Sequence, residues 1–98
     1  MQFVVTAMDF TDAGALERRM AHRETHLAAV RKMIADGQFL SGGAILDANG
    51  GMIGSTLHLE FADRASLEKH IQNDPYIIGK VWEHVDIKAA KLVPLTPK

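Results

Sequence analysis

The sequence has 98 residues, of which 47% are hydrophobic and 23% are charged, and its formal net charge at pH 7 is -1. We expect a single domain over residues 1–98, because this length supports one hydrophobic core and the composition is ordinary for a globular protein. The small net charge offers no basic surface to nucleic acid or to a membrane. With no signal-peptide pattern and no apolar run long enough to cross a bilayer, we expect a cytoplasmic protein.

Hydrophobic periodicity predicts six elements in the order β-α-β-β-α-β. Alternating or β-branched runs indicate strands, and apolar residues that recur at steps of three and four indicate helices. Asp36-Gly37, Asn49-Gly50 and Asp74-Pro75 carry the residue types that end helices and form turns. The predicted strands are residues 3–8, 39–46, 55–61 and 81–93, and the predicted helices are residues 13–35 and 63–73.

This order predicts an α+β fold of the ferredoxin-like βαββαβ type, with a four-stranded antiparallel sheet. Helices would cover one face of the sheet and leave the other face open. The open face would mix Thr, His and Glu with apolar side chains. A homodimer that packs sheet against sheet would cover it, so we expect a homodimer.

The stretch His22-Arg23-Glu24-Thr25-His26 lies in the first predicted helix, and its two histidines suggest a metal site. In a zinc-protease helix the glutamate follows the first histidine directly, as in H-E-x-x-H. Here Glu24 points more than about 100° around the helix from both histidines. No third ligand follows at a telling spacing, and the sequence has no Cys. We therefore predict no metal site and a solvated His22.

The apolar stripe of the same helix places Arg23 near its centre and His26 at its border. An arginine on an inward face must pair with a carboxylate or reach into a cleft, because an unpaired buried guanidinium is very costly. Two interpretations stay open: a structural ion pair, or Arg23 and His26 side by side at the mouth of an internal pocket. The stripe is taken from Leu16, Met20, Leu27, Val30 and Ile34.

His26 could act as a general acid or base near neutral pH if a carboxylate orients its second nitrogen. Asp74 stands out among the candidate carboxylates because Asp74-Pro75 interrupts the chain just after the second helix. Its alternative role, as a cap for a following turn of helix, is equally open. The candidate carboxylates are Asp9, Asp36, Glu60, Asp74 and Asp86.

Four short motifs, in this order and spacing, resemble the YciI-like (YCII-related) family over residues 3–93. The resemblance implies a dimeric α+β barrel, in which ferredoxin-like protomers pack sheet to sheet. The motifs are Arg23-Glu24-Thr25-His26-Leu27, Gly42-Gly43, Gly54-Ser55 and Asp74-Pro75-Tyr76.

The resemblance also implies a His/Asp-centred site in a pocket between helix and sheet. Carried over residue by residue, it makes His26 and Asp74 the catalytic pair and Arg23, Ser55 and Tyr76 the substrate-binding residues. One characterised branch of the family is a dehydrochlorinase that acts on a chlorinated hydroxyhydroquinone, and most members have no assigned substrate.

Two positions depart from the family pattern. Ala44 stands where the family often has Pro, and Ala89-Ala90 replaces a common Pro-Phe pair. Both positions touch the pocket wall or a strand end. The identity of the substrate is therefore not carried over, whereas the His/Asp pair is unaffected.

We expect a cofactor-independent small-molecule enzyme of lyase, dehydrochlorinase or isomerase type, acting on a small anionic compound, aromatic compounds included. His26 would be the general acid/base, Asp74 would fix its tautomer, and Arg23 would bind the anionic group. The alternative is a non-catalytic dimeric binding or accessory domain. A carboxylate of Asp74 within roughly 3 Å of one His26 nitrogen, with the other nitrogen facing a cavity, would favour the enzyme.

Overall fold

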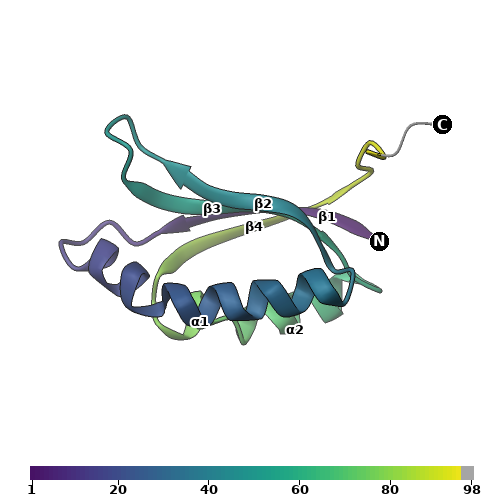
Figure 1. Cartoon of the computed structure of the whole chain (residues 1–98), viewed down its shortest axis with the longest axis horizontal. Helices are drawn as coiled ribbons and strands as arrows, with labels where there is room; N and C mark the ends of the chain where they lie inside the picture. The colour runs from purple at the N-terminus through teal and green to yellow at the C-terminus, as the bar shows by residue number, and fades with distance from the viewer. Residues whose placement is uncertain (96–98) are drawn as a thin grey trace.

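The computed structural model describes residues 1–95, and in it a four-stranded antiparallel sheet carries its helices on one face (Figure 1). The strand order is β2-β3-β1-β4, so the chain's first strand lies at the centre of the sheet. The elements are β1 (Gln2–Asp9), α1 (Ala15–Ala35), β2 (Phe39–Leu46), β3 (Met52–Glu60), α2 (Arg64–Gln72), α3 (Pro75–Ile78) and β4 (Trp82–Ala90). This confirms the predicted ferredoxin-like arrangement.

The differences from the predicted elements lie at element ends and at one additional helix. β3 begins at Met52 rather than at residue 55, and β4 ends at Ala90 rather than at residue 93. The short helix α3 occupies the stretch that the sequence indicated only as a break after Asp74-Pro75. No described helix is long and apolar enough to cross a membrane.

Local sequence signals account for several of the element ends. The Asp63 side chain accepts a hydrogen bond from the Ser66 N–H and caps α2. Gly37 follows α1 with a φ of 75°, in the left-handed region that favours glycine. At the start of α1, however, the cap residue is Gly14, and Asp12 accepts from the Gly14 N–H just before the helix.

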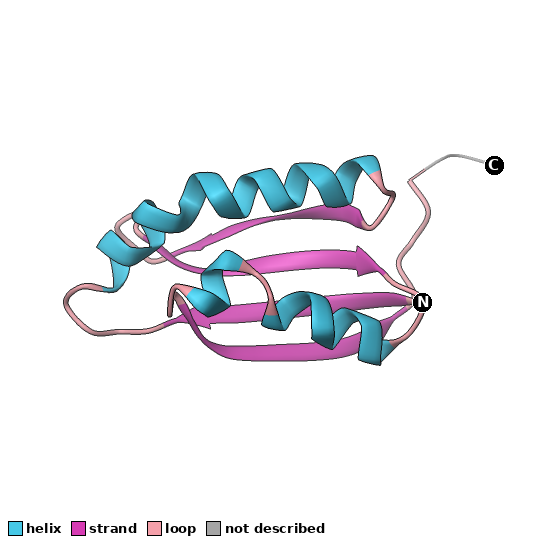
Figure 2. Cartoon of the chain, turned by 90° about the horizontal axis from the view of Figure 1, so that it is seen from below, coloured by secondary structure: helices cyan, strands magenta, loops and turns pink. Residues whose placement is uncertain are grey.

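The core lies between the sheet and the helices. In β1, Phe3, Val5 and Ala7 alternate with half-buried residues and pair across to the buried residues of β3. Helix α1 runs over the β2–β3 half of the sheet, and α2 and α3 run over the β1–β4 half (Figure 2). The buried core residues are Phe3, Val5, Ala7, Val30, Met33, Leu57, Leu59, Phe61, Leu67, Ile71, Tyr76, Val81 and Trp82.

Of the five residues in the predicted inward stripe of α1, Val30 is buried and Leu27 is half-buried, but the other three face outward. Leu16, Met20 and Ile34 are 51%, 52% and 54% exposed. At 100° per residue, the centre of the true buried face is rotated from these three by about 90° on average. Two of its members are polar, and their partners come from other elements, so hydrophobic periodicity could not place this face. The buried residues of α1 are Ala15, Arg19, His26, Val30 and Met33.

Candidate active site

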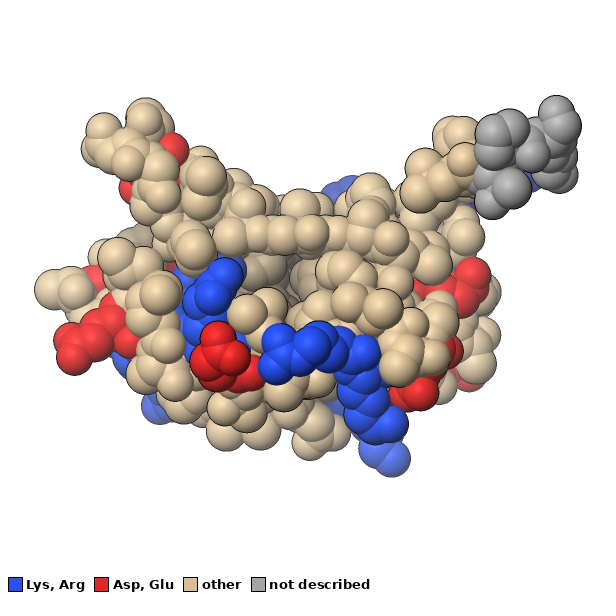
Figure 3. Space-filling view, viewed as in Figure 1, with Lys and Arg blue, Asp and Glu red and all other residues tan. Residues whose placement is uncertain are grey.

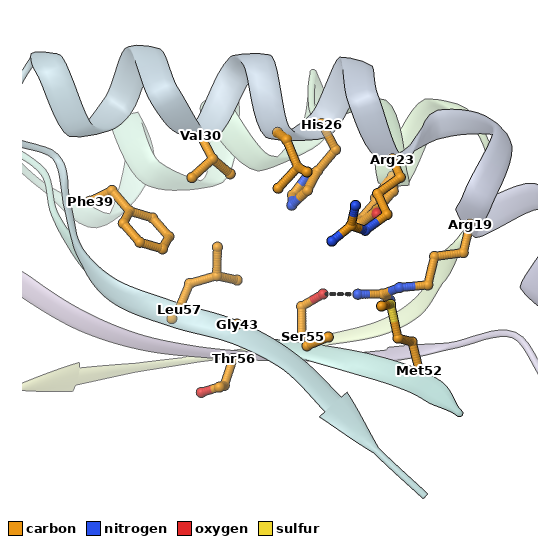
Figure 4. Close-up of a pocket in the computed structure, with 14 residues that line it drawn as sticks. Arg19, Arg23, His26, Val30, Phe39, Gly43, Met52, Ser55, Thr56 and Leu57 are labelled. Atoms are coloured by element: carbon orange, nitrogen blue, oxygen red, sulfur yellow. Dashed lines mark hydrogen bonds between the residues drawn. The ribbon is translucent and has the colours of Figure 1, made fainter. Parts of the chain in front are cut away.

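A cavity of about 260 Å³ lies between α1 and the strands β2 and β3 (Figure 4). This volume is at the small end of ligand pockets, which run from roughly 300 Å³ upward, so the cavity suits a small molecule. One end is charged or polar and the other is apolar. The polar end is formed by Arg19, Arg23, His26 and Ser55, and the apolar end by Val30, Phe39 and Leu57.

His26 and Asp74, 48 positions apart in the sequence, meet at the wall of this cavity. The His26 Nδ1 and Asp74 Oδ1 atoms are 2.8 Å apart, and the residues are 6% and 5% exposed. Asp74 Oδ1 also accepts a hydrogen bond from the Tyr76 N–H, and through this bond Asp74 caps α3. Both interpretations of Asp74 therefore hold together: the cap of α3 fixes the carboxylate that binds the imidazole.

The hydrogen bond to Asp74 determines which ring nitrogen of His26 is available. An ionised carboxylate only accepts hydrogen bonds, so a neutral His26 carries its proton on Nδ1. The lone pair is then on Nε2, and His26 is one of the residues that line the cavity (Figure 4). This is the arrangement of a general base whose tautomer is fixed.

Two aromatic residues hold the imidazole in place. Tyr76 stacks on His26 with ring centroids 3.9 Å apart and 10° between the ring planes. Trp82 meets the same imidazole edge-on, with centroids 5.5 Å apart. Burial raises the pKa of the Tyr76 hydroxyl, so Tyr76 stays protonated near neutral pH and does not compete with His26 as a base. Tyr76 thus lines the cavity, as the sequence analysis expected.

Arg23 supplies positive charge to the cavity. Its guanidinium points into the cavity beside His26 (Figure 4), and the residue is half-buried. Within residues 1–95, no carboxylate forms an ion pair with it. Of the two interpretations left open for Arg23, the structure therefore has the arginine in a cleft, where its charge can bind an anion.

The buried ion pair of α1 belongs to Arg19, which the sequence analysis missed. Arg19 Nη1 donates to both carboxylate oxygens of Asp9, at 2.8 and 2.9 Å, and both side chains are almost fully buried. Burial raises the pKa of Asp9, and its bonds to Arg19 oppose this shift. The sequence carried two signals for this ion pair. Asp9 continues the inward alternation of β1, and Arg19 lies one helical turn before Arg23.

Arg19 also connects the ion pair to the rest of the site. Its guanidinium carbon lies 4.9 Å from the centroid of the Tyr76 ring, which places a cation against this aromatic residue. Arg19 Nη2 donates to Ser55 Oγ at 3.0 Å, the contact drawn as a dashed line in Figure 4. Ser55 is thus in the cavity wall, as expected, but its hydroxyl is bound by a residue that the sequence analysis did not include.

The other candidate carboxylates lie away from His26. Asp9 binds Arg19, and the remaining three form exposed or partly exposed ion pairs. These pairs are Asp36 with Lys32, Glu60 with the N-terminal amine, and Asp86 with Lys88.

His22, predicted to be solvated, is half-buried in the structure, and its ring lies close to Gly79. A Cβ built on Gly79 would approach His22 Cδ2 to 2.5 Å. Among residues 1–95, no group of three His, Cys, Asp or Glu side chains could hold a metal ion.

The strand order and the helix-covered cavity define a ferredoxin-like α+β domain with a pocket between helix and sheet. The model of the YCII-related domain matches residues 1–91, and the chain belongs to this family. Protein YciI of Escherichia coli O6:H1 is 33% identical over 99 residues, covering 95% of this chain and 99% of its own length. An uncharacterised protein of Haemophilus influenzae is similar to the same extent, 33% over 99 residues with the same coverage.

Solved structures share the fold. A 5-chloro-2-hydroxyhydroquinone dehydrochlorinase from Burkholderia phenoliruptrix AC1100, in complex with 2,5-dihydroxybenzoquinone, superposes with a TM-score of 0.82 at 24% identity. The match covers 93% of this chain and 94% of that protein. An antibiotic biosynthesis monooxygenase superposes with a TM-score of 0.55 at 17% identity, covering 96% of this chain and all of the other. At these low identities the superpositions show a common fold alone, so the function of this chain has to be argued from its site.

Proposed function

We propose that this protein is a cofactor-independent enzyme that moves a proton on a small anionic compound, with His26 as general acid/base and Asp74 as its orienting carboxylate. The observation that carries the proposal is the 2.8 Å contact between His26 Nδ1 and Asp74 Oδ1 at the wall of a cavity. An imidazole oriented by a carboxylate in this way has the geometry that general acid/base proton transfer requires.

The proposed reaction is an elimination or an isomerisation. His26 Nε2 takes a proton from the substrate, and the Asp74 carboxylate stabilises the imidazolium that forms. In an elimination the leaving group departs with its bonding electrons, and in an isomerisation the proton returns to another atom of the same substrate. Arg23 binds the anionic group and stabilises the negative charge that develops when the proton leaves.

The shape of the cavity supports a compound with one oxygen-bearing end and one apolar end. Arg23 and Ser55 lie at the polar end, and Phe39 and Leu57 lie at the other. A single ring with acidic oxygens fits this division and the small volume. The 2,5-dihydroxybenzoquinone bound to the structurally similar dehydrochlorinase is also a single ring with acidic oxygens, although it carries them on both sides of the ring. We therefore propose small oxygenated rings as the substrate class without transferring the individual substrate.

We further propose that two copies pack through the open sheet face. Leu40 and Val93, both exposed, line a depression on that face together with His58. In Figure 3, the upper edge of the molecule, along β2, shows mostly uncharged residues. Sedimentation velocity should give twice the chain mass, and Leu40→Glu with Val93→Glu should shift it to one chain. A monomeric native chain would contradict the dimer.

The activity is tested by exchange in heavy water, which reports proton abstraction whatever the complete reaction is. Small halogenated and unhalogenated hydroxyquinols and aromatic carbon acids are incubated with the protein, and deuterium incorporation is followed by NMR. We expect exchange with the native chain and its loss in His26→Gln. Exchange that survives in His26→Gln would contradict the proposal, and binding without exchange in any compound would favour the non-catalytic alternative.

A further inference from the structure

The hydroxyl of Ser55 binds two donors at once. Its Oγ accepts from Arg19 Nη2 at 3.0 Å and from Trp82 Nε1 at 3.1 Å. The two donors reach it from different elements, α1 and the first residue of β4. Ser55 itself is 4% exposed and lies in the wall of the cavity.

The hydrogen-bonding capacity of the Ser55 hydroxyl shows which further bond it can form. A serine hydroxyl has two acceptor lone pairs and one O–H donor. A guanidinium and an indole N–H can only donate, so Ser55 must accept in both contacts. Both lone pairs are then used, and the O–H has neither Arg19 nor Trp82 as a possible acceptor.

The surroundings keep the hydroxyl in this state. Asp9 holds Arg19 by two hydrogen bonds, and the Tyr76 ring lies against its guanidinium, so the donor to Ser55 is fixed. Accepting a bond from a cation strengthens the O–H as a donor. The same neighbours offer no base to remove the proton, so this serine is not set up as a nucleophile.

We infer that Ser55 donates a hydrogen bond to the ligand and cannot accept one from it. The site therefore selects compounds with an acceptor oxygen, such as a carbonyl or phenolate, beside the Ser55 hydroxyl. Asp9, Arg19 and Trp82 are positioning residues, since they act through Ser55. The inference rests on the proposed binding of a small anion in this cavity and adds a requirement for a second oxygen beside the group bound by Arg23. A ligand without that oxygen leaves the O–H unsatisfied in a buried site, which costs affinity.

The test compares two probes in two variants. The probes are 2,5-dihydroxybenzoquinone, which presents oxygens around its ring, and benzoate, whose two oxygens both belong to the one anionic group that Arg23 would bind and whose ring is otherwise apolar. Ser55→Ala removes the donor. Thr56→Val is the matched control, because it removes a hydroxyl at the next position of β3. Thr56 also lines the cavity, but its side chain points away from it (Figure 4).

Dissociation constants are measured by calorimetry for the native chain and both variants. We expect Ser55→Ala to weaken quinone binding by roughly 10-fold to 100-fold, the usual effect of losing a hydrogen bond to a charged oxygen. Benzoate binding in the same variant should change by less than about threefold, which also shows that the cavity has kept its shape. Thr56→Val should leave both probes unaffected. If Ser55→Ala is too unstable to measure, Ser55→Cys, with a side chain of similar size and a weak donor, takes its place.

The contrary results are distinct. An equal loss for both probes in Ser55→Ala would mean that Ser55 supports the cavity without selecting an oxygen, and no loss would mean that its O–H does not face the ligand. Either result overturns the inference and leaves the proposed function standing. If the native chain binds neither probe, the proposed anion site fails together with the inference.

Discussion

Tyr76 and His26 form a parallel stack, with 3.9 Å between ring centroids and 10° between ring planes. Tyr76 follows the cap residue of α3 by two positions, and His26 lies near the middle of α1. The stack, together with the bond from His26 to Asp74, leaves the imidazole one orientation. Pre-orientation of this kind removes a cost that a mobile side chain would meet at each turnover.

The stack should be supported by the ring of Tyr76 and not by its hydroxyl. Tyr76→Phe keeps the ring, so the free energy of unfolding should change by less than about 1 kcal/mol, whereas Tyr76→Leu should lower it by about 2 kcal/mol or more. Deuterium exchange should be nearly native in Tyr76→Phe and reduced in Tyr76→Leu. Urea unfolding and the exchange assay measure the two effects. Equal behaviour of the two variants would contradict a role for the stack.

The Asp9–Arg19 pair should dominate the stability of this end of the fold. Asp9→Ala leaves a buried guanidinium without its carboxylate and should lower the free energy of unfolding by about 3–5 kcal/mol. Adding Arg19→Met to that variant removes the uncompensated charge and should restore part of the loss. Urea denaturation of the single and double variants tests this. A double variant less stable than Asp9→Ala would contradict the account.

The cavity wall in β2 requires a glycine at position 42 but not at position 43. A Cβ on Gly42 would lie 2.4 Å from the Thr56 carbonyl oxygen, a backbone atom that cannot move aside cheaply, whereas a Cβ on Gly43 meets nothing within 4 Å. Gly42→Ala should lower the free energy of unfolding by about 1–3 kcal/mol, and Gly43→Ala should leave it unchanged or raise it slightly. Thermal unfolding of the two variants is the measurement. Equal loss in both would count against the strand geometry described.

Acid should weaken the loop that leads into α1. Hydrogen bonds from Arg18 lower the pKa of Asp12 from 3.8 to about 2. Because the folded-state pKa lies below the unfolded one, the contribution of Asp12 is complete above about pH 4 and is lost as the pH falls toward 2. Asp12→Asn should therefore flatten the curve of stability against pH in this interval. Parallel curves for the two proteins between pH 2 and pH 4 would contradict the assignment.

Most of the fold could be predicted from local patterns in the sequence. The alternation of β1 and β3, the Asp63 cap and the Asn49-Gly50 turn each depend on neighbours in sequence. The inward face of α1 could not be predicted in this way. Its apolar residues Leu16 and Met20 are half exposed, because the buried positions carry the polar residues of the site.

The site was predictable to the extent that its motifs carry a family resemblance. That resemblance indicated the pairing of His26 and Asp74, and the structure brings the two within hydrogen-bonding distance. Arg19 was not predicted as a site residue, because a buried arginine is recognised by its partner. That partner, Asp9, lies on a different element, at the end of β1. Only the tertiary fold brings these two charges together.

The most direct test of the account is the tautomer of His26, read from long-range proton–nitrogen NMR spectra at a pH where the ring is neutral. The account predicts that Nδ1 carries the proton in the native chain and Nε2 does not, and that Asp74→Ala moves the ring toward the Nε2-protonated form. A native His26 protonated on Nε2 would have no lone pair facing the cavity, and His26 could not then be the base.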